Sequence, residues 1–306
     1  MDEVRAPIFH IIHGSFVDGY GIRTTVFLKG CPLKCIWCCN PEGQKFHPEL
    51  KVSAAKCTGC GNCVSVCPVG AIKLETDAGN VRLDIDRQLC TNCFKCIDVC
   101  YTGALDRFGE YYTVDELFAV IKKDEQFYRS SGGGVTIGGG EATCYPEFVL
   151  ELIKRCKENY IHTAIDTCGF VTSPEGIKAL EEADLLLFDV KGIELAAHQR
   201  NTGVSNEPIL QNLKRLDAIG KPLIIRVPVI PGYTDSEETL NGIAELLGSL
   251  KSVERVDIMA VHEFGKVKYA QLGMEYKLNV EPIPPERQER IKALFEAHGL
   301  NTQLGG

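Results

Sequence analysis

The sequence predicts an α/β fold built on a parallel sheet, which a small cysteine-rich insert interrupts near its beginning. Short apolar strands alternate with helices from residue 113 onward, an order that is typical of parallel sheets. Eight of the 15 cysteines lie between residues 57 and 100, in two copies of one pattern. Three more cysteines, Cys31, Cys35 and Cys38, follow a predicted strand near the N-terminus.

The alternating segments define six β/α units. The predicted strands are short runs rich in β-branched and apolar residues: 23–28, 134–137, 162–166, 185–190, 223–229 and 256–261. The predicted helices are residues 113–128, 173–183, 205–219 and 235–250, with two more beginning at Pro146 and Pro285. A capping box from Thr113 to Glu116 marks the start of the first helix. Six units are too few to close an eight-stranded barrel.

The composition argues against several classes of protein. The chain has 306 residues, 44% hydrophobic and 24% charged, which is an ordinary globular mixture. A net charge of −8 without a run of Lys and Arg argues against a nucleic-acid partner. No stretch of about 18 apolar residues occurs, so we expect no membrane span. Residues 1–5 lack signal-peptide order, so we expect a cytoplasmic protein whose cysteines bind metal rather than form disulfides.

The insert repeats a metal-ligand pattern. Cys57-x₂-Cys60-x₂-Cys63-x₃-Cys67 recurs 33 residues later as Cys90-x₂-Cys93-x₂-Cys96-x₃-Cys100, and both runs end in a Gly-Ala-aliphatic tail. The pattern resembles that of bacterial ferredoxins with two [4Fe–4S] clusters, in which the fourth cysteine of each run ligates the other cluster. The resemblance implies one cluster on Cys57, Cys60, Cys63 and Cys100, and another on Cys67, Cys90, Cys93 and Cys96. Two zinc knuckles are the alternative.

The insert is too short to bury much core. A segment of about 50 residues needs metal staples for stability, and two clusters would supply them. We therefore expect a ferredoxin-like insert at residues 57–105. The main domain would then consist of residues 1–56 and 106–306.

The three cysteines near the N-terminus suit a different kind of cluster. Cys31, Cys35 and Cys38 can hold three irons of a [4Fe–4S] cube and leave the fourth iron open to a ligand. Cys39 directly follows Cys38 and is poorly placed to reach that iron, and we expect no ligand role for it or for the isolated Cys144, Cys156 and Cys168. A structural or zinc-binding cysteine cluster is the alternative.

This C-P-L-K-C-I-W-C stretch resembles the C-x₃-C-x₂-C loop of the radical S-adenosylmethionine (SAM) superfamily. The resemblance implies a partial (β/α)₆ barrel and a SAM molecule whose amino and carboxylate groups bind the open iron. Trp37 matches the aromatic position that packs on the adenine in that family. Ordinary core packing is the alternative for this residue.

The ends of the predicted strands carry further candidates, since parallel barrels place their chemistry at the carboxyl ends of the strands. The second strand leads into Gly138-Gly139-Gly140-Glu141, the third into Asp166-Thr167-Cys168-Gly169, and the fourth into Asp189-Val190-Lys191. Carboxylates there can bind a hard cation, or they can simply cap the following loops. Arg226 stands within an apolar strand and needs a charged partner, and His262 follows the last strand.

Several motifs resemble those of glycyl radical enzyme activating enzymes, such as pyruvate formate-lyase activating enzyme. Asp18 opens a stretch similar to D-G-P-G-I-R, with Tyr20 in place of Pro, and Trp37 to Glu42 match another run, with Cys39 where many members have His. The G-G-E, D-T-x-G, D-x-K and H-x-x-G-x-x-K motifs follow in order. The resemblance implies that SAM contacts come from Gly139, Gly140, Glu141, Lys191 and His262, and that Asp166 and Asp189 hold a monovalent cation. For Arg226, either a SAM carboxylate or a partner residue would supply the opposite charge.

The resemblance also implies an activity. Such enzymes cleave SAM reductively and use the deoxyadenosyl radical to remove an α-hydrogen from a glycine of a partner enzyme. We expect Asp18, Lys191, Arg226 and His262 to serve this reaction, and the insert clusters to carry electrons from a flavodoxin or ferredoxin. A radical SAM enzyme for a small molecule is one alternative. An electron-transfer protein is another.

Overall fold

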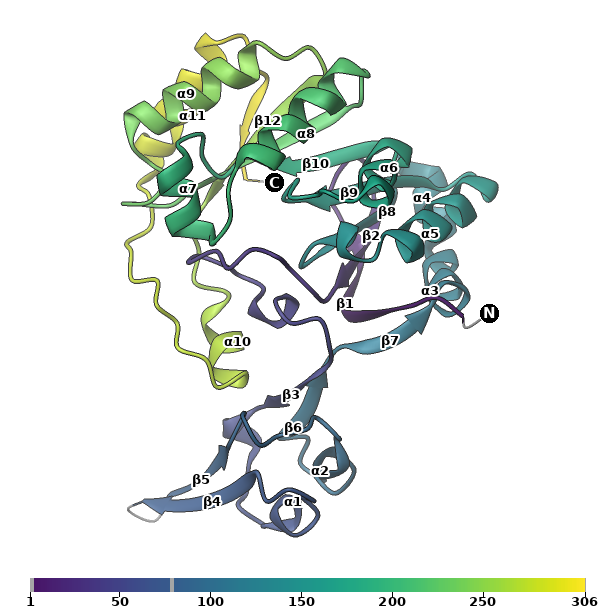
Figure 1. The fold of residues 1–306 in the computed structure, drawn as a ribbon, viewed down its shortest axis with the longest axis vertical. Helices are drawn as coiled ribbons and strands as arrows, with labels where there is room; N and C mark the ends of the chain where they lie inside the picture. Colours follow the sequence, from purple (N-terminus) through teal and green to yellow (C-terminus); the bar gives the residue numbers. More distant parts are fainter. Residues whose placement is uncertain (1–2, 78–79, 306) are drawn as a thin grey trace.

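The computed structural model describes residues 3–77 and 80–305. In this part of the chain, nine strands form one sheet in the order β13-β12-β11-β10-β9-β8-β2-β1-β7 (Figure 1). In chain order they are β1 Arg5–Ser15, β2 Arg23–Leu28, β7 Glu110–Thr113, β8 Gly134–Gly139, β9 His162–Thr167, β10 Leu185–Asp189, β11 Leu223–Val229, β12 Val253–Ala260 and β13 Thr302–Leu304. No helix in the described residues is long and apolar enough to cross a bilayer.

Within this sheet, β2 and β8 to β13 run parallel to one another. The six predicted β/α units are confirmed. The short strand β13 adds to the far edge. Two antiparallel strands that the sequence did not predict, β1 and β7, form the other edge. The sheet is therefore an open α/β sheet with β13 and β7 at its two margins, as expected for a partial rather than a closed barrel.

Helices cover one face of this sheet (Figure 1). They are α3 Val114–Ile121, α4 Glu125–Ser131, α5 Pro146–Glu158, α6 Pro174–Glu182, α8 Glu207–Ala218, α9 Glu237–Gly248 and α11 Pro285–Ala297. Two shorter helices, α7 Leu195–Thr202 and α10 Lys266–Gln271, lie away from this layer. The capping box at Thr113 is present, with Glu116 donating its amide to the Thr113 hydroxyl and accepting from the Thr113 amide. The predicted helix 113–128 is divided, because a 3₁₀ turn at Lys122–Asp124 separates α3 from α4.

The core lies between the sheet and its helices. Phe148, Leu152 and Ile153 of α5 are almost completely buried, and so are the apolar residues of β10 and β11. Burying side chains of this size contributes about 1.5–3 kcal/mol each, before the entropy of ordering the chain is subtracted. The strands are therefore held in fixed positions, and so are the loops at their carboxyl ends.

The cysteine-rich insert projects from the main part at the lower end of Figure 1. Its stem consists of β3 Glu49–Val52 paired antiparallel with β6 Leu105–Phe108. Beyond the stem lie α1 Asn62–Ser65, a hairpin of β4 Ile72–Asp77 and β5 Asn80–Ile85, and α2 Lys95–Asp98. A small core of Leu50, Cys63, Ile72, Cys96 and Leu105 holds these elements together.

Candidate active site

A cavity of about 360 Å³ lies at the carboxyl ends of the parallel strands. It brings together residues that are far apart in the sequence and that come from the first cysteine loop and from six strands, β2 and β8 to β12. Of the predicted site residues, its wall contains Asp18, Cys31, Cys35, Trp37, Cys38, Gly139, Gly140, Asp166, Asp189, Lys191, Arg226 and His262. Glu141 is the one predicted residue of this site that does not line the cavity.

The three-cysteine loop is fixed by backbone hydrogen bonds on both sides. The Gly30 amide donates to the Gly43 carbonyl at 2.7 Å. The amides of Lys34 and Ile36 donate to the carbonyls of Thr202 and Asn201, at 2.7 and 3.0 Å, at the end of α7. The sequence did not predict α7, whose buried polar residues His198, Asn201 and Thr202 break the apolar helix pattern. This helix holds the middle of the loop against the cavity.

The thiols of this loop need a metal to ionise. All three cysteines are free, and burial together with Cys38 and Asp189 raises the pKa of Cys35 to about 12, although Lys191 opposes this. Burial and Glu141 raise the pKa of Cys31 as well. A bound metal cation reverses this effect and deprotonates coordinating thiols. Three soft sulfur donors on one short loop fit an iron–sulfur cluster.

Gly139 and Gly140 are required by close packing against the start of this loop. A Cβ on Gly140 would lie 2.2 Å from the Gly30 carbonyl oxygen, and Gly139 has φ +115° with the Leu28 backbone 2.4 Å from the corresponding position. The Gly140 amide donates to the Leu28 carbonyl at 2.8 Å. Backbone alone therefore forms this wall of the cavity, where a ligand can approach it closely.

Glu141 is turned into the protein. Its carboxylate is completely buried and accepts from the Thr143 hydroxyl at 2.7 Å, the Thr167 hydroxyl at 2.9 Å and the Cys168 amide at 2.8 Å. Its backbone amide donates to Gly30 at 2.7 Å. In this arrangement Glu141 positions the loop after β9, and its predicted direct contact with SAM stays a prediction.

Arg226 connects two carboxylates across the cavity. Its guanidinium donates from Nη2 to Asp18 Oδ1 at 3.1 Å and from Nη1 to Asp166 Oδ2 at 3.0 Å. Asp18 also accepts from the hydroxyls of Ser15 and Thr25, each at 2.7 Å. Burial opposes ionisation of Asp18, but Arg226 and these hydroxyls hold its pKa below the ordinary value. The Asp18 loop is thus fixed to the strand ends by a buried ion pair.

The pKa of Asp166 is shifted in the opposite direction to that of Asp18. Burial and the charges of Asp189 and Asp18 raise its pKa to about 7, even though Arg226 lies 3.0 Å away. Lys191 donates to Asp189, and although burial opposes its charge, Asp189 and Cys35 raise the pKa of Lys191. Three carboxylates therefore meet two cationic side chains, which leaves one negative charge in excess when all five groups are ionised. Such a wall favours a cationic ligand.

The remaining predicted side chains lie at the edge of the cavity. Trp37 is half-buried, with its ring 6.2 Å from that of Tyr233. His262 is exposed and lies 4.4 Å from the Phe264 ring, and partial burial lowers its pKa. Two cysteines that we did not expect as ligands, Cys39 and Cys168, also line the cavity. Burial and Glu141 raise the pKa of Cys168 well above its ordinary value, as they do for Cys31, so this shift does not distinguish it from the predicted ligands, and its lack of a ligand role stays a prediction.

The insert contains two smaller cavities, and each is lined by four cysteines. One contains Cys57, Cys60, Cys63 and Cys100, and the other Cys67, Cys90, Cys93 and Cys96. Each set combines three cysteines of one run with the last cysteine of the other run. These are the two sets that the ferredoxin resemblance implied.

The two exchanged cysteines share a second property. The Ala71 amide donates to Cys67 Sγ at 3.2 Å, and the Leu105 amide donates to Cys100 Sγ at 3.3 Å. Although burial opposes it, these and neighbouring amides lower the pKa of both thiols. The repeated Gly-Ala-aliphatic tails thus supply donors to a cysteine thiolate in each half of the insert, which suits a cluster ligand.

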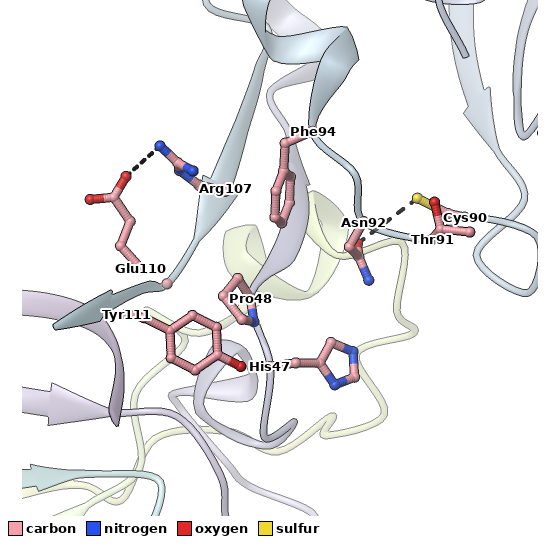
Figure 2. Close-up of a pocket in the computed structure, with 10 residues that line it drawn as sticks. His47, Pro48, Cys90, Thr91, Asn92, Phe94, Arg107, Glu110 and Tyr111 are labelled. Carbon is pink, nitrogen blue, oxygen red and sulfur yellow. Dashed lines mark hydrogen bonds and ion pairs between the residues drawn. The ribbon is translucent and has the colours of Figure 1, made fainter. Parts of the chain in front are cut away.

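A larger cavity, of about 700 Å³, lies where the insert joins the main part. Figure 2 shows Phe94, Pro48 and Tyr111 along it, with an ion pair between Arg107 and Glu110 on one side. Cys90 borders this cavity, but its wall contains none of the predicted charged residues at the carboxyl ends of the parallel strands. The 360 Å³ cavity, with its cysteines and charged strand ends, is therefore the candidate active site.

Comparisons with known proteins agree with this picture. The Radical SAM superfamily matches residues 94–242, and the 4Fe-4S dicluster domain matches residues 56–104. The three-cysteine loop lies before the first range, and the insert separates it from the rest of the main part. QueE from Escherichia coli has a similar fold, with a TM-score of 0.51 at 15% identity over 98% of this chain and 93% of that one.

Two curated relatives are similar over nearly their whole length. The choline trimethylamine-lyase activating enzyme of Oleidesulfovibrio alaskensis is 42% identical, over 99% of both chains. The trans-4-hydroxy-L-proline dehydratase activating enzyme of Clostridioides difficile is 40% identical, over 95% of this chain and 96% of the relative.

The fold, the cysteine loop and these matches define a radical SAM enzyme with an iron–sulfur insert. Within that class, the chain belongs to the activating enzymes of glycyl radical enzymes.

Proposed function

We propose that this chain removes an α-hydrogen from a glycine of a partner glycyl radical enzyme, after reductive cleavage of SAM. The observation that carries this proposal is the buried contact of Arg226 with both Asp18 and Asp166. It fixes the loop that resembles the D-G-P-G-I-R motif in the wall of the cavity that the three-cysteine loop also lines. When bound, an iron–sulfur cluster on those cysteines would supply the electron that cleaves SAM.

The chain's own residues would bind and orient SAM. Gly139 and Gly140 offer bare backbone to the methionyl group, and Lys191 stays cationic for its carboxylate. Arg226 Nε is buried and has no acceptor within the described residues, so a ligand carboxylate can accept a hydrogen bond from it. Trp37 offers an aromatic face for the adenine, and His262 a neutral ring at the edge of the cavity.

Asp166 and Asp189 would hold a monovalent cation beside SAM. Both lie in the wall that carries one excess negative charge, and Asp166 is protonated in part near neutral pH. A cation or the SAM sulfonium would remove this proton by favouring the carboxylate.

We propose three [4Fe–4S] clusters: one on Cys31, Cys35 and Cys38, and two on the crossed sets of the insert, which we place at residues 57–105. The match at residues 56–104 and the β3–β6 stem support this division. Cys60 and Cys93 are exposed, so a flavodoxin or ferredoxin can approach either insert cluster from outside. The relatives, at 36–42% identity, are named for several different partner enzymes, so identity does not select one for this chain.

The test is to incubate the reconstituted protein anaerobically with SAM, reductant and a panel of glycyl radical enzymes. We expect slow formation of 5′-deoxyadenosine alone and faster formation with the correct partner. Asp18→Ala should keep its iron and lose most of the partner-dependent rate, because the loop that receives the partner is released. If no enzyme of the panel accelerates cleavage, while a small metabolite changes mass with SAM, the small-molecule alternative replaces this proposal.

A further inference from the structure

Helix α10 contacts the segment that immediately follows the three-cysteine loop. Lys268 Nζ lies 2.6 Å from Glu42 Oε1 and donates to Asn40 Oδ1 at 2.7 Å. The Tyr269 hydroxyl donates to the Cys38 carbonyl at 3.1 Å. The helix therefore holds the loop at a predicted cluster ligand and at two residues beyond it.

Helix α10 packs closely against the loop, and a buried carboxylate lies at their contact. A Cβ on Gly265, which precedes the helix, would lie 3.0 Å from the Cys39 Cα, so a side chain there would push the two backbones apart by a few tenths of an ångström. Glu42 is 3% exposed, and its second oxygen has no partner within the described residues. A buried carboxylate with one free oxygen depends on its cation, so Glu42 depends on Lys268.

The other end of α10 is attached to the insert. Arg87 donates from Nη2 to the Gln271 carbonyl at 3.1 Å, and from Nη1 to the Leu50 carbonyl on the stem strand β3. The Leu50 amide donates in turn to Asn92 Oδ1 at 3.1 Å, between Cys90 and Cys93. Figure 1 shows α10 between the main sheet and this stem.

We propose that α10 is a brace that positions the three-cysteine loop against the insert, with Lys268 and Arg87 as positioning residues. The inference rests on the proposed cluster site at Cys31–Cys38. Neither residue touches SAM in this account. Each acts through the loop, because a small displacement of Cys38 would change how the open iron faces the ligand cavity.

Lys268→Met tests the loop end of the brace. In reconstituted protein we expect wild-type iron content, a SAM dissociation constant raised about tenfold, and a weaker SAM-induced change in the electron paramagnetic resonance (EPR) spectrum of the reduced cluster. Lys268→Arg should restore most of both. The matched control is Lys266→Met, on the same helix, whose Nζ lies 4.0 Å from Glu263 on the surface. Wild-type SAM affinity and spectra in Lys268→Met would overturn the inference.

If Lys268→Met does not fold, the double variant Lys268→Met/Glu42→Gln also removes the unpaired buried charge and should restore folding. It should still bind SAM about tenfold more weakly. Wild-type affinity in the double variant would overturn the inference as well.

Arg87→Leu tests the insert end. Hydrogen–deuterium exchange of residues 38–44 should become at least threefold faster than in the wild type, while Arg82→Leu, on the exposed side of the hairpin, should leave it unchanged. Equal hydrogen–deuterium exchange of these residues in Arg87→Leu and the wild type would overturn the inference. None of these measurements needs a partner enzyme, so failure of activation would not affect them. A wrong cluster assignment would instead appear as missing iron in the wild type.

Discussion

Arg226 on β11 donates to Asp18 in the loop between β1 and β2 at 3.1 Å, although 208 residues separate them in the sequence. The same guanidinium holds Asp166, so one buried cation joins three segments around the cavity. Removing it leaves two carboxylates without their cation. This makes Arg226 the residue on which the geometry of the site depends most.

Arg226→Met should lower the free energy of unfolding by roughly 3–5 kcal/mol, because a buried charge loses its partner. Denaturant unfolding of the reconstituted protein measures this. The control is Arg215→Met, whose pair with Glu181 at 2.8 Å is exposed and should contribute no more than about 1 kcal/mol. Equal losses of unfolding free energy in the two variants would mean that the Arg226 contacts contribute no more to stability than an exposed ion pair.

SAM binding should depend on pH through Asp166. Because its pKa is raised to about 7, the group is protonated below neutrality in the free protein, and the cationic sulfonium favours the ionised form. SAM affinity should therefore rise between pH 6 and pH 8, by less than about tenfold per unit. Asp166→Asn should abolish this rise in calorimetric titrations. A rise of the same size in Asp166→Asn would assign it to another group.

The pH dependence of folding stability that Asp166 causes should have the opposite sign to that of SAM affinity. A carboxyl whose pKa is raised by folding is protonated in both states at pH 3, and above about pH 7 it is ionised in both. The folded state should therefore lose stability as pH rises from about 4 to 7, and Asp166→Asn should remove that part of the pH dependence. Unfolding curves at several pH values, compared between the two proteins, measure the difference.

Cluster content should follow the crossed cysteine sets. Fully reconstituted protein should contain about 12 irons, and Cys67→Ala and Cys100→Ala should each lose roughly four, from different clusters. Ser substitution of Cys39, Cys144, Cys156 or Cys168 should leave the iron content unchanged. Iron analysis with Mössbauer spectroscopy distinguishes these cases. About four irons in the wild type would contradict the ferredoxin-like assignment, and a large loss in Cys39→Ser would change the ligand set of the first loop.

Gly140→Ala should disrupt the cavity, since the new methyl group meets the rigid Gly30 carbonyl at 2.2 Å. Overpacking of this kind costs about 1–3 kcal/mol, and SAM binding should weaken with it. Gly242→Ala is a suitable control. Its methyl group meets only the flexible tip of the Ile193 side chain at 2.1 Å. Similar SAM affinity in both variants would show that the Gly139–Gly140 wall tolerates displacement.

Much of the fold was predictable because the six parallel strands are short apolar runs and their helices have clear start signals. Strand β11 was predicted to the residue, and β2 likewise. Apolar and polar residues alternate poorly in the missed strand β1. It contains Pro7, and the charged or polar residues Arg5, His10 and His13 obscure its pattern. Helices α7 and α10 are short and polar, and tertiary contacts rather than periodicity hold them in place.

The site was predictable where the spacing of residues indicates their chemistry, as in the cysteine runs. It was less predictable where the direction of a side chain decides its role. The Gly-Gly-Glu sequence indicated a ligand contact for Glu141, but sequence cannot show that Thr143, Thr167 and Cys168 occupy its carboxylate. Nor does any local pattern connect Lys268 with Glu42, which are 226 residues apart. The cysteine at position 39, beside the cavity, has no explanation in these contacts.

The central claim is most directly tested by following the hydrogen itself. A partner enzyme labelled with α,α-dideuteroglycine is incubated anaerobically with this protein, SAM and reductant, and the deoxyadenosine is analysed by mass spectrometry alongside EPR of the partner. We expect one deuterium in each 5′-deoxyadenosine, which should form in roughly one-to-one ratio with a glycyl radical. Deoxyadenosine that forms with the partner but contains no deuterium, and leaves no glycyl signal, would contradict it.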